Sequence, residues 1–177
     1  MFALKPANPP LTDWRGKRVW IIGASAGIGL TVAQSLHAHG ALLTLSARNL
    51  KPLETDAQLS QCQHLAMDIS DTQSIAHAIA QLTAPVDVVM IFAGTYQAGS
   101  LLNHRHDAIQ QTMATNLTGV IDCCHQLLPK LIEQQHGHLV LVGSSAAYLP
   151  MPNASVYGAS KAGLRYFAQD RKSTRLN

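Results

Sequence analysis

Short apolar runs alternate with amphipathic stretches along most of this chain, and this alternation limits the folds open to it. The runs are rich in valine, isoleucine and leucine, and the stretches between them carry apolar residues at helical spacing. Repeated strand–helix units with short connections predict an α/β fold with a doubly wound parallel sheet and helices on both faces. Strands are expected at 18–22, 41–45, 64–67, 86–92 and 139–142, and helices at 27–39, 50–59, 71–82, 106–135 and from about 153.

A glycine-rich turn lies between the first expected strand and the first helix. In a doubly wound sheet, ligands bind beyond the carboxyl ends of the strands. Glycines at this turn let a pyrophosphate approach the backbone, and the helix N-terminus offers unpaired N–H groups. A turn that serves packing alone is the alternative. The predicted nucleotide contacts are Gly23, Ser25, Ala26, Gly27, Ile28 and Gly29.

Composition narrows the class of protein. The length of 177 residues suits one domain, and 47% hydrophobic content excludes a mainly disordered chain. Only 13% of residues are charged, about half the usual share, which favours extensive burial or an oligomer. No apolar run is long enough to span a membrane, so no membrane partner is expected. Three cysteines without CxxC spacing and a start without a signal-peptide core favour the cytoplasm.

The last eight residues, DRKSTRLN, differ from the rest of the chain. They resemble the translation of a sequencing-library adapter, so we interpret residues 170–177 as a non-native tail. Without them the net charge falls from +3 to +1, and the other basic residues are scattered, so no nucleic-acid partner is expected. Residues 1–13 are interpreted as an N-terminal extension, and residues 14–169 as an incomplete dinucleotide-binding domain.

The GxxxGxG spacing of residues 23–29 resembles the short-chain dehydrogenase/reductase family. Four further segments follow in that family's order. They are Asp68-Ile69 after the third strand, Ala93-Gly94 after the fourth, Asn116 within NLTG, and Ser144 placed 13 positions before Tyr157, which with Lys161 forms a YxxxK signature. The resemblance covers about residues 14–169.

This resemblance implies a Rossmann-like fold that here lacks the family's last strands and substrate lid. It implies an NAD(P)-dependent oxidoreductase that acts on a small carbonyl or alcohol substrate, with a homodimeric or homotetrameric parent protein. It further implies that Asp68, Ile69, Ala93 and Gly94 contact the cofactor.

The residue types suit proton transfer. A free tyrosine has a pKa of about 10 and is a poor base at neutral pH. Lys161, one helical turn after Tyr157, would favour the phenolate, and Tyr157 could then exchange a proton with substrate. Ser144 would hydrogen-bond the substrate oxygen. The resemblance implies that Asn116 maintains a water link to Lys161 and that Tyr157 and Lys161 also bind the cofactor, Lys161 through the nicotinamide ribose.

Each of these residues also has a simpler interpretation. A tyrosine and a lysine four positions apart often form a surface pair. Ser144 or Ser145 could satisfy a strand end, and Asn116 could be a buried helix group with a local partner. The alternative function is therefore a nucleotide-binding scaffold or regulatory module without turnover, which the complete Ser, Tyr and Lys set disfavours.

The end of the second strand predicts cofactor choice. An acidic residue there accepts hydrogen bonds from the adenosine ribose, whereas an arginine accommodates a 2′-phosphate. No Asp or Glu lies between Thr44 and Leu53, while Arg48 and Asn49 follow the strand. We therefore expect NADP rather than NAD, with Ser46, Arg48 and Asn49 as the candidate contacts. An ordinary solvated Arg48 is the alternative.

Three residues, in two segments, depart from the family pattern. Ile22 stands where the family usually has threonine, and Ile91-Phe92 stand where it usually has two asparagines. We expect packing between Ile22 and Phe92 to replace the lost hydrogen bonds.

Histidine pairs raise the question of a metal site. His104 and His106, and likewise His136 and His138, have HxH spacing, but neither pair has a cysteine or carboxylate cluster beside it. No metal site is expected.

Overall fold

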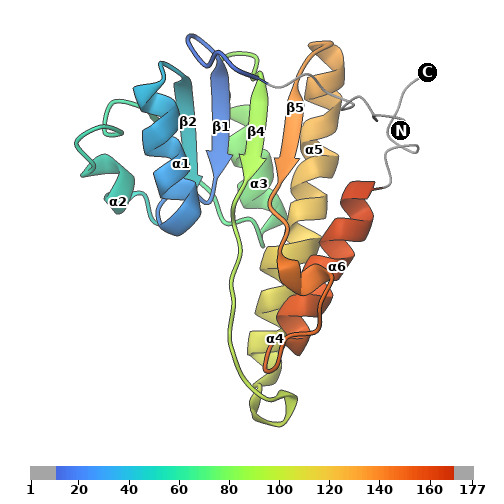
Figure 1. Cartoon of the computed structure of the whole chain (residues 1–177). Coiled ribbons are helices and arrows are strands. Elements are labelled where there is room, and N and C mark those ends of the chain that lie inside the picture. Colours follow the sequence, from blue (N-terminus) through green and yellow to red (C-terminus); the bar gives the residue numbers. More distant parts are fainter. Residues whose placement is uncertain (1–10, 170–177) are drawn as a thin grey trace, which may run out of the picture.

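The computed structural model describes residues 11–169. Five parallel strands form one sheet in the order β3-β2-β1-β4-β5, and Figure 1 labels β2, β1, β4 and β5 of this sheet. The chain starts at the centre of the sheet, moves outward to β3, and returns to the other side of β1, so the strand order reverses between β1 and β4. The strands are β1 (Arg18–Ile22), β2 (Leu42–Ala47), β3 (Gln63–Ala66), β4 (Val88–Ile91) and β5 (His138–Leu141).

Helices cover both faces of the sheet, which confirms the doubly wound prediction (Figure 1). One buried cluster joins the sheet to α1 and α2, and the other joins it to α3, α5 and α6. The helices are α1 (Gly27–Ala38), α2 (Lys51–Glu54), α3 (Thr72–Ala80), α4 (His106–Met113), α5 (Gly119–Glu133) and α6 (Ser155–Gln169). Single turns are η1 (Leu101–Asn103), the π-helical η2 (Ala114–Thr118) and η3 (Ser145–Ala147).

The central strand β1 has the predicted bounds, because the apolar residues 19–22 that follow the exposed Arg18 are buried on both faces of the parallel sheet. Trp20 packs into one cluster and Ile21 into the other, as strand alternation requires. The indole Nε1 of Trp20 donates a 2.8 Å hydrogen bond to Ser46 Oγ, so the polar atom of this buried side chain has a partner.

Two helix ends are formed by local caps. Gly40 has a φ of +80°, and the N–H of Ala41 donates to the carbonyl of Leu36, so α1 ends in a glycine cap. The Asp71 carboxylate accepts a 3.0 Å bond from the N–H of Gln73 and caps α3.

Two expected helices differ from the prediction. The helix expected at 50–59 ends at Glu54, because the Asp56 carboxylate accepts the N–H groups of Gln58 and Leu59 and closes a turn instead. The helix expected at 106–135 is interrupted by η2, which contains Asn116. Single π turns inside α-helices often lie at functional sites.

The expected packing between Ile22 and Phe92 is wrong. Successive strand residues point to opposite faces, and Ile22 belongs to the cluster shared with α3 and α5, whereas Phe92 packs against the cluster shared with α1. The carbonyl of Ile22 instead accepts the N–H groups of Phe92, at 2.8 Å, and Ala93, at 3.0 Å. Backbone hydrogen bonds therefore join the two strand ends.

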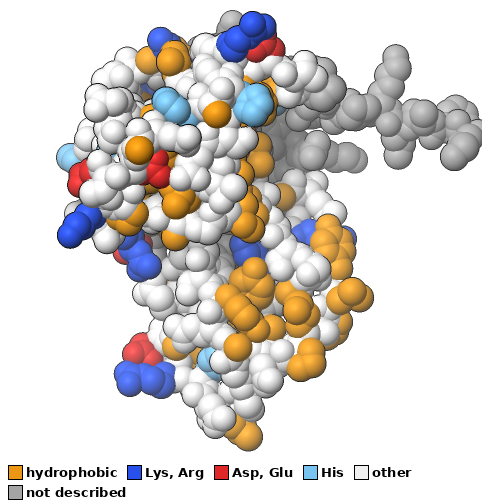
Figure 2. All heavy atoms as spheres, turned by 60° about the vertical axis from the view of Figure 1, so that its left-hand side comes forward, with side chains coloured by type: hydrophobic (Ala, Val, Ile, Leu, Met, Phe, Trp, Pro, Cys, Tyr) orange, Lys and Arg blue, Asp and Glu red, His pale blue; other side chains and the backbone are white. Residues whose placement is uncertain are grey.

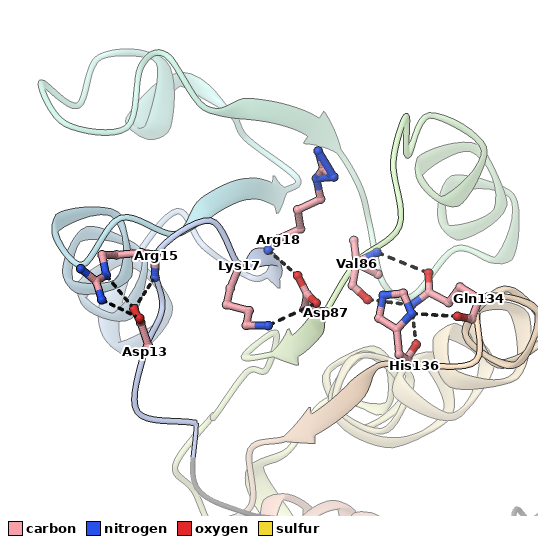
Figure 3. Close-up of polar contacts among 8 residues, drawn as sticks. All are labelled: Asp13, Arg15, Lys17, Arg18, Val86, Asp87, Gln134 and His136. Carbon is pink, nitrogen blue, oxygen red and sulfur yellow. Dashed lines mark hydrogen bonds and ion pairs between the residues drawn. The ribbon is translucent and has the colours of Figure 1, made fainter.

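Polar contacts hold the amino ends of the strands, opposite the predicted site (Figure 3). The Asp87 carboxylate accepts the N–H of Arg18 at 2.9 Å and lies 3.8 Å from Lys17 Nζ. Gln134, just after α5, donates from Nε2 to the carbonyl of Val86 at 2.7 Å and accepts its N–H at 3.4 Å. These contacts fix where β1 and β4 begin.

Cys123 and Cys124 are buried in the core, where burial raises the pKa of both thiols to about 12.

Between residues 11 and 169, no helix is both long and apolar enough to cross a membrane. The expected tail at 170–177 and most of the expected N-terminal extension lie outside the described residues.

Candidate functional site

A cavity of about 270 Å³ opens at the carboxyl ends of β1, β2, β3 and β4. It lies at the reversal of strand order, where doubly wound sheets bind ligands. Eight of the predicted cofactor residues line it: Gly23, Ser25, Ala26, Arg48, Asp68, Ile69, Ala93 and Gly94. Met67 and Thr115 also line it and were not predicted.

The glycine turn shapes one wall of this cavity. Gly23 has a φ of +88°, and a Cβ there would lie 2.5 Å from the backbone nitrogen of Ala93, so only glycine fits. Gly27 also has a positive φ, and a Cβ at Gly29 would overlap the carbonyl oxygen of Gly23. Gly27, Ile28 and Gly29 form the first turn of α1 and are not among the cavity-lining residues.

No side-chain oxygen or negative charge neutralises the N–H groups at the N-terminus of α1. No side chain caps its first turn, and that turn contains no acidic residue. Its N–H groups therefore keep their positive potential at the rim of the cavity, as anion sites at helix N-termini do.

Arg48 and Asp68 face the same cavity from the ends of β2 and β3. Desolvation raises the pKa of Asp68, but hydrogen bonds from Ser70 and the charge of Arg48 outweigh it, and the net pKa lies below the ordinary value. The side chain of Asn49 makes a local contact instead, because its oxygen accepts the N–H of Lys51 at 3.1 Å, at the start of α2.

Asn116 is fully buried and holds the backbone that follows β4. Its Oδ1 accepts the N–H of Thr95 at 2.7 Å, and its Nδ2 donates to the carbonyl of Thr95 at 2.8 Å. Nδ2 also donates to Ser160 Oγ at 3.1 Å, and Ser160 donates to the carbonyl of Tyr157 at 2.7 Å. The π turn thus connects the cavity wall to the helix that carries Tyr157.

Lys161 lies beside these groups. Its side chain is only 6% exposed, its Nζ donates to the carbonyl of Val142 at 3.0 Å, and its Nζ lies 5.9 Å from the centre of the Tyr157 ring. Burial lowers its pKa. A Cβ at Gly94 would lie 3.8 Å from Nζ, which places the amine next to the cavity.

Ser144 lies at the start of η3, which packs against α6. Its hydroxyl accepts the N–H of Ala146 at 3.2 Å. In the part of the chain that the structure describes, no hydrogen bond joins Ser144 to Tyr157. The structure therefore links Asn116 to the backbone of Tyr157 through Ser160 and places the Lys161 amine beside the Tyr157 ring. Ser144 lies on the loop that leads into the same helix.

Three residues of this arrangement escaped the sequence prediction. Thr95 supplies the backbone groups that Asn116 holds, Ser160 links Asn116 to α6, and the Tyr96 ring packs on the Tyr157 ring. Ser160 is a helical turn after Tyr157, a spacing that could have drawn attention to it. No local pattern marks Thr95 or Tyr96.

Residues 11–169 contain no group of three or more His, Cys, Asp or Glu side chains arranged to hold a metal ion. His104 and His136 belong to segments that flank helices, away from the cavity lining.

Comparison with known proteins agrees with this geometry. A family model described as short chain dehydrogenase matches residues 17–174. Dehydrogenase/reductase SDR family member 7B of Mus musculus is 31% identical over 165 residues, covering 86% of this chain and 51% of the relative. Sulfoacetaldehyde reductase of Chromohalobacter salexigens is 34% identical over 159 residues, covering 85% and 63%.

Solved structures agree as well. A gluconate 5-dehydrogenase from Burkholderia cenocepacia, in complex with NADP and tartrate, matches with a TM-score of 0.79 and 25% identity, over 88% of this chain and 65% of that one. An actinorhodin polyketide ketoreductase variant with NADPH matches with a TM-score of 0.79 and 26% identity, over 86% and 62%. The chain spans about half the length of the first curated relatives that it matches. By its glycine turn, its Asn–Tyr–Lys grouping and a family match over nearly all its described residues, this chain belongs to the short-chain dehydrogenase family.

Proposed function

We propose that the full protein is an NADP(H)-dependent oxidoreductase that interconverts a small carbonyl compound and its alcohol, with Tyr157 as the general acid and base. The observation that carries this proposal is the buried Lys161 amine, 5.9 Å from the Tyr157 ring and adjacent to the cavity at Gly94. A surface tyrosine–lysine pair would have an exposed amine, whereas this lysine is 6% exposed.

The cavity suits a dinucleotide. The glycine cradle at Gly23, which a Cβ would fill, and the uncapped first turn of α1 would hold the pyrophosphate. Asp68 and Ile69 would hold the adenine, and Ala93, Gly94 and Lys161 the nicotinamide end. When bound, the cofactor supplies or accepts the hydride.

The chain's own residues would then move the proton. During reduction, the Tyr157 hydroxyl donates its proton to the substrate oxygen, and the Lys161 ammonium stabilises the phenolate that remains. Ser144 would donate a hydrogen bond to the same oxygen. Asn116 keeps the cavity wall at Thr95 aligned with α6, and the Val142 carbonyl orients the amine.

The preference for NADP rests on Arg48, which lines the cavity at the end of β2. No carboxylate between Thr44 and Leu53 competes for the ribose. Arg48 would pair with the 2′-phosphate of NADP through charge-assisted hydrogen bonds.

Tyr157→Phe tests the catalytic role in the full protein. NADPH oxidation against small ketones should fall by at least about 100-fold, the usual contribution of a positioned acid or base. NADPH affinity, measured by fluorescence titration, should stay within about twofold, and Tyr166→Phe is the matched control on an exposed part of α6. If wild-type protein binds NADPH but reduces no ketone, the scaffold alternative is correct.

Arg48→Ala tests cofactor choice. Wild-type protein should bind NADPH more tightly than NADH, and the variant should lose about tenfold in NADPH affinity with little change for NADH. Tighter binding of NADH by the wild type would overturn the preference.

A further inference from the structure

The exposed ring of Tyr96 lies directly against the proposed catalytic tyrosine. The two ring centres are 4.8 Å apart and the planes are tilted by 57°, within the range of favourable aromatic pairs. Tyr96 follows Thr95, which lines the cofactor cavity, and its side chain is 52% exposed. Within residues 11–169, about half of the Tyr96 side chain is therefore uncovered beside the place where Tyr157 must meet its substrate.

Backbone contacts hold Tyr96 in this place. The preceding residue, Thr95, has both its N–H and its carbonyl bound by the buried Asn116 amide. Further along, the N–H of Gly99 donates to the carbonyl of Asn153 at 2.9 Å, which ties this loop to the loop before α6. Tyr96 is thus anchored on both sides.

The two loops around Tyr157 carry no formal charge. Residues 94–104 and 143–155 contain no Asp, Glu, Lys or Arg. The second loop exposes Tyr148, Leu149 and Met151, and Figure 2 shows hydrophobic side chains gathered on the lower half of the molecule, at the level of η3 and α6 in Figure 1.

The cations nearest to these loops in sequence contact other groups of the chain. Lys161 Nζ donates to the Val142 carbonyl at 3.0 Å, Arg105 pairs with Asp107 at 2.8 Å, and the Arg165 guanidinium stacks on the Tyr148 ring at 4.3 Å. A substrate carboxylate or phosphate between the two loops would lose hydration without gaining an ion pair from a loop residue.

We propose that Tyr96 is a specificity-determining wall of the substrate site, and that the substrate is an uncharged ketone or alcohol bearing a planar, unsaturated ring next to the reacting carbon. This inference rests on the proposed function, because Tyr157 must reach the reacting oxygen. A ring attached to the reacting carbon then lies close enough to contact the free part of Tyr96. Tilted or offset ring contacts favour an aromatic group over a saturated ring of the same size.

The test compares acetophenone with cyclohexyl methyl ketone, which share a carbon skeleton and differ in ring saturation. The ratio of kcat/KM for the two ketones, measured with NADPH and the full protein, should favour acetophenone in the wild type and in Tyr96→Phe. In Tyr96→Leu the ratio should fall about two- to twelvefold, the change expected for loss of one aromatic contact. Tyr166→Leu, the same substitution at an exposed site on α6, should keep the wild-type ratio.

An unchanged ratio in Tyr96→Leu overturns the proposal. 4-Acetylbenzoate, which adds a carboxylate to acetophenone, should react more slowly than acetophenone in the wild type, and a faster reaction overturns the uncharged class. Equilibrium binding of both ketones by saturation-transfer NMR separates this inference from the proposed function. If neither ketone is turned over, the proposed function fails. Tighter binding of acetophenone that Tyr96→Leu abolishes would then still support Tyr96 as a wall of the substrate site. If neither ketone binds, or if acetophenone does not bind more tightly, the role of Tyr96 is refuted.

Discussion

Asn116→Ala should destabilise the protein more than any single surface substitution near the site. The side chain is fully buried and makes three hydrogen bonds, two to the backbone of Thr95 and one to Ser160. At about 1 kcal/mol for each bond, the expected loss in the free energy of unfolding is about 3 kcal/mol. Water can partly replace the partners at Thr95, which is only half-buried, but not at Ser160, which is fully buried.

Urea unfolding followed by tryptophan fluorescence measures this loss. Trp20 is fully buried in the sheet, so its fluorescence changes when unfolding exposes the indole to water. Asn103→Ala is the matched control: this exposed residue makes no side-chain hydrogen bond within residues 11–169, and its change should stay within about 0.5 kcal/mol. A loss below about 1 kcal/mol for Asn116→Ala, with an unchanged denaturant slope, would refute the view that this amide joins the loop after β4 to α6.

Three further predictions concern other parts of the fold. Gly23→Ala should lower NADPH affinity and the thermal midpoint, because the new methyl would lie 2.5 Å from the Ala93 nitrogen, whereas Gly143→Ala, with nothing within 4 Å, should not lower the midpoint. Gln134→Ala should cost about 1–2 kcal/mol in urea unfolding, because it removes both bonds to Val86, and an unchanged midpoint would contradict their role. Burial lowers the pKa of Lys161 below its ordinary 10.5, so the unfolded chain binds more protons and stability should rise as the pH climbs toward 10.5. Lys161→Met should weaken that rise in urea titrations at successive pH values, and an identical slope would argue against a buried, charged amine.

Much of the fold follows from local pattern. The β1 strand could be predicted to the residue, because an apolar run between Arg18 and Gly23 has one stable place, in the centre of a covered parallel sheet. The glycine cap at Gly40 and the carboxylate cap at Asp71 also act within a few residues of themselves. The glycine turn was predicted from its place between a strand and a helix. Asn116, Tyr157 and Lys161 were predicted from the resemblance to the family, and their roles stay predictions.

Tertiary contacts decided the rest. Residues 114–118 look helical in sequence, yet they form a π turn, where Asn116 reaches Thr95 across 21 positions and Gly119 packs so tightly on the Ile69 carbonyl that a Cβ would overlap it. Because side chains alternate along a strand, Ile22 and Phe92 lie on opposite faces of the sheet. The residue types alone had led us to predict that these two side chains pack together.

The sequence by itself therefore determined which backbone elements form and which chemical groups are available, because propensity, capping and side-chain periodicity act over a few residues. Only the tertiary structure decided that Lys161 is buried beside Tyr157, and that Tyr96, 61 positions away in the chain, covers part of the same phenol ring. Such contacts depend on how separate loops return to one edge of the sheet. No local pattern of residues encodes the distance between side chains that are far apart in the sequence.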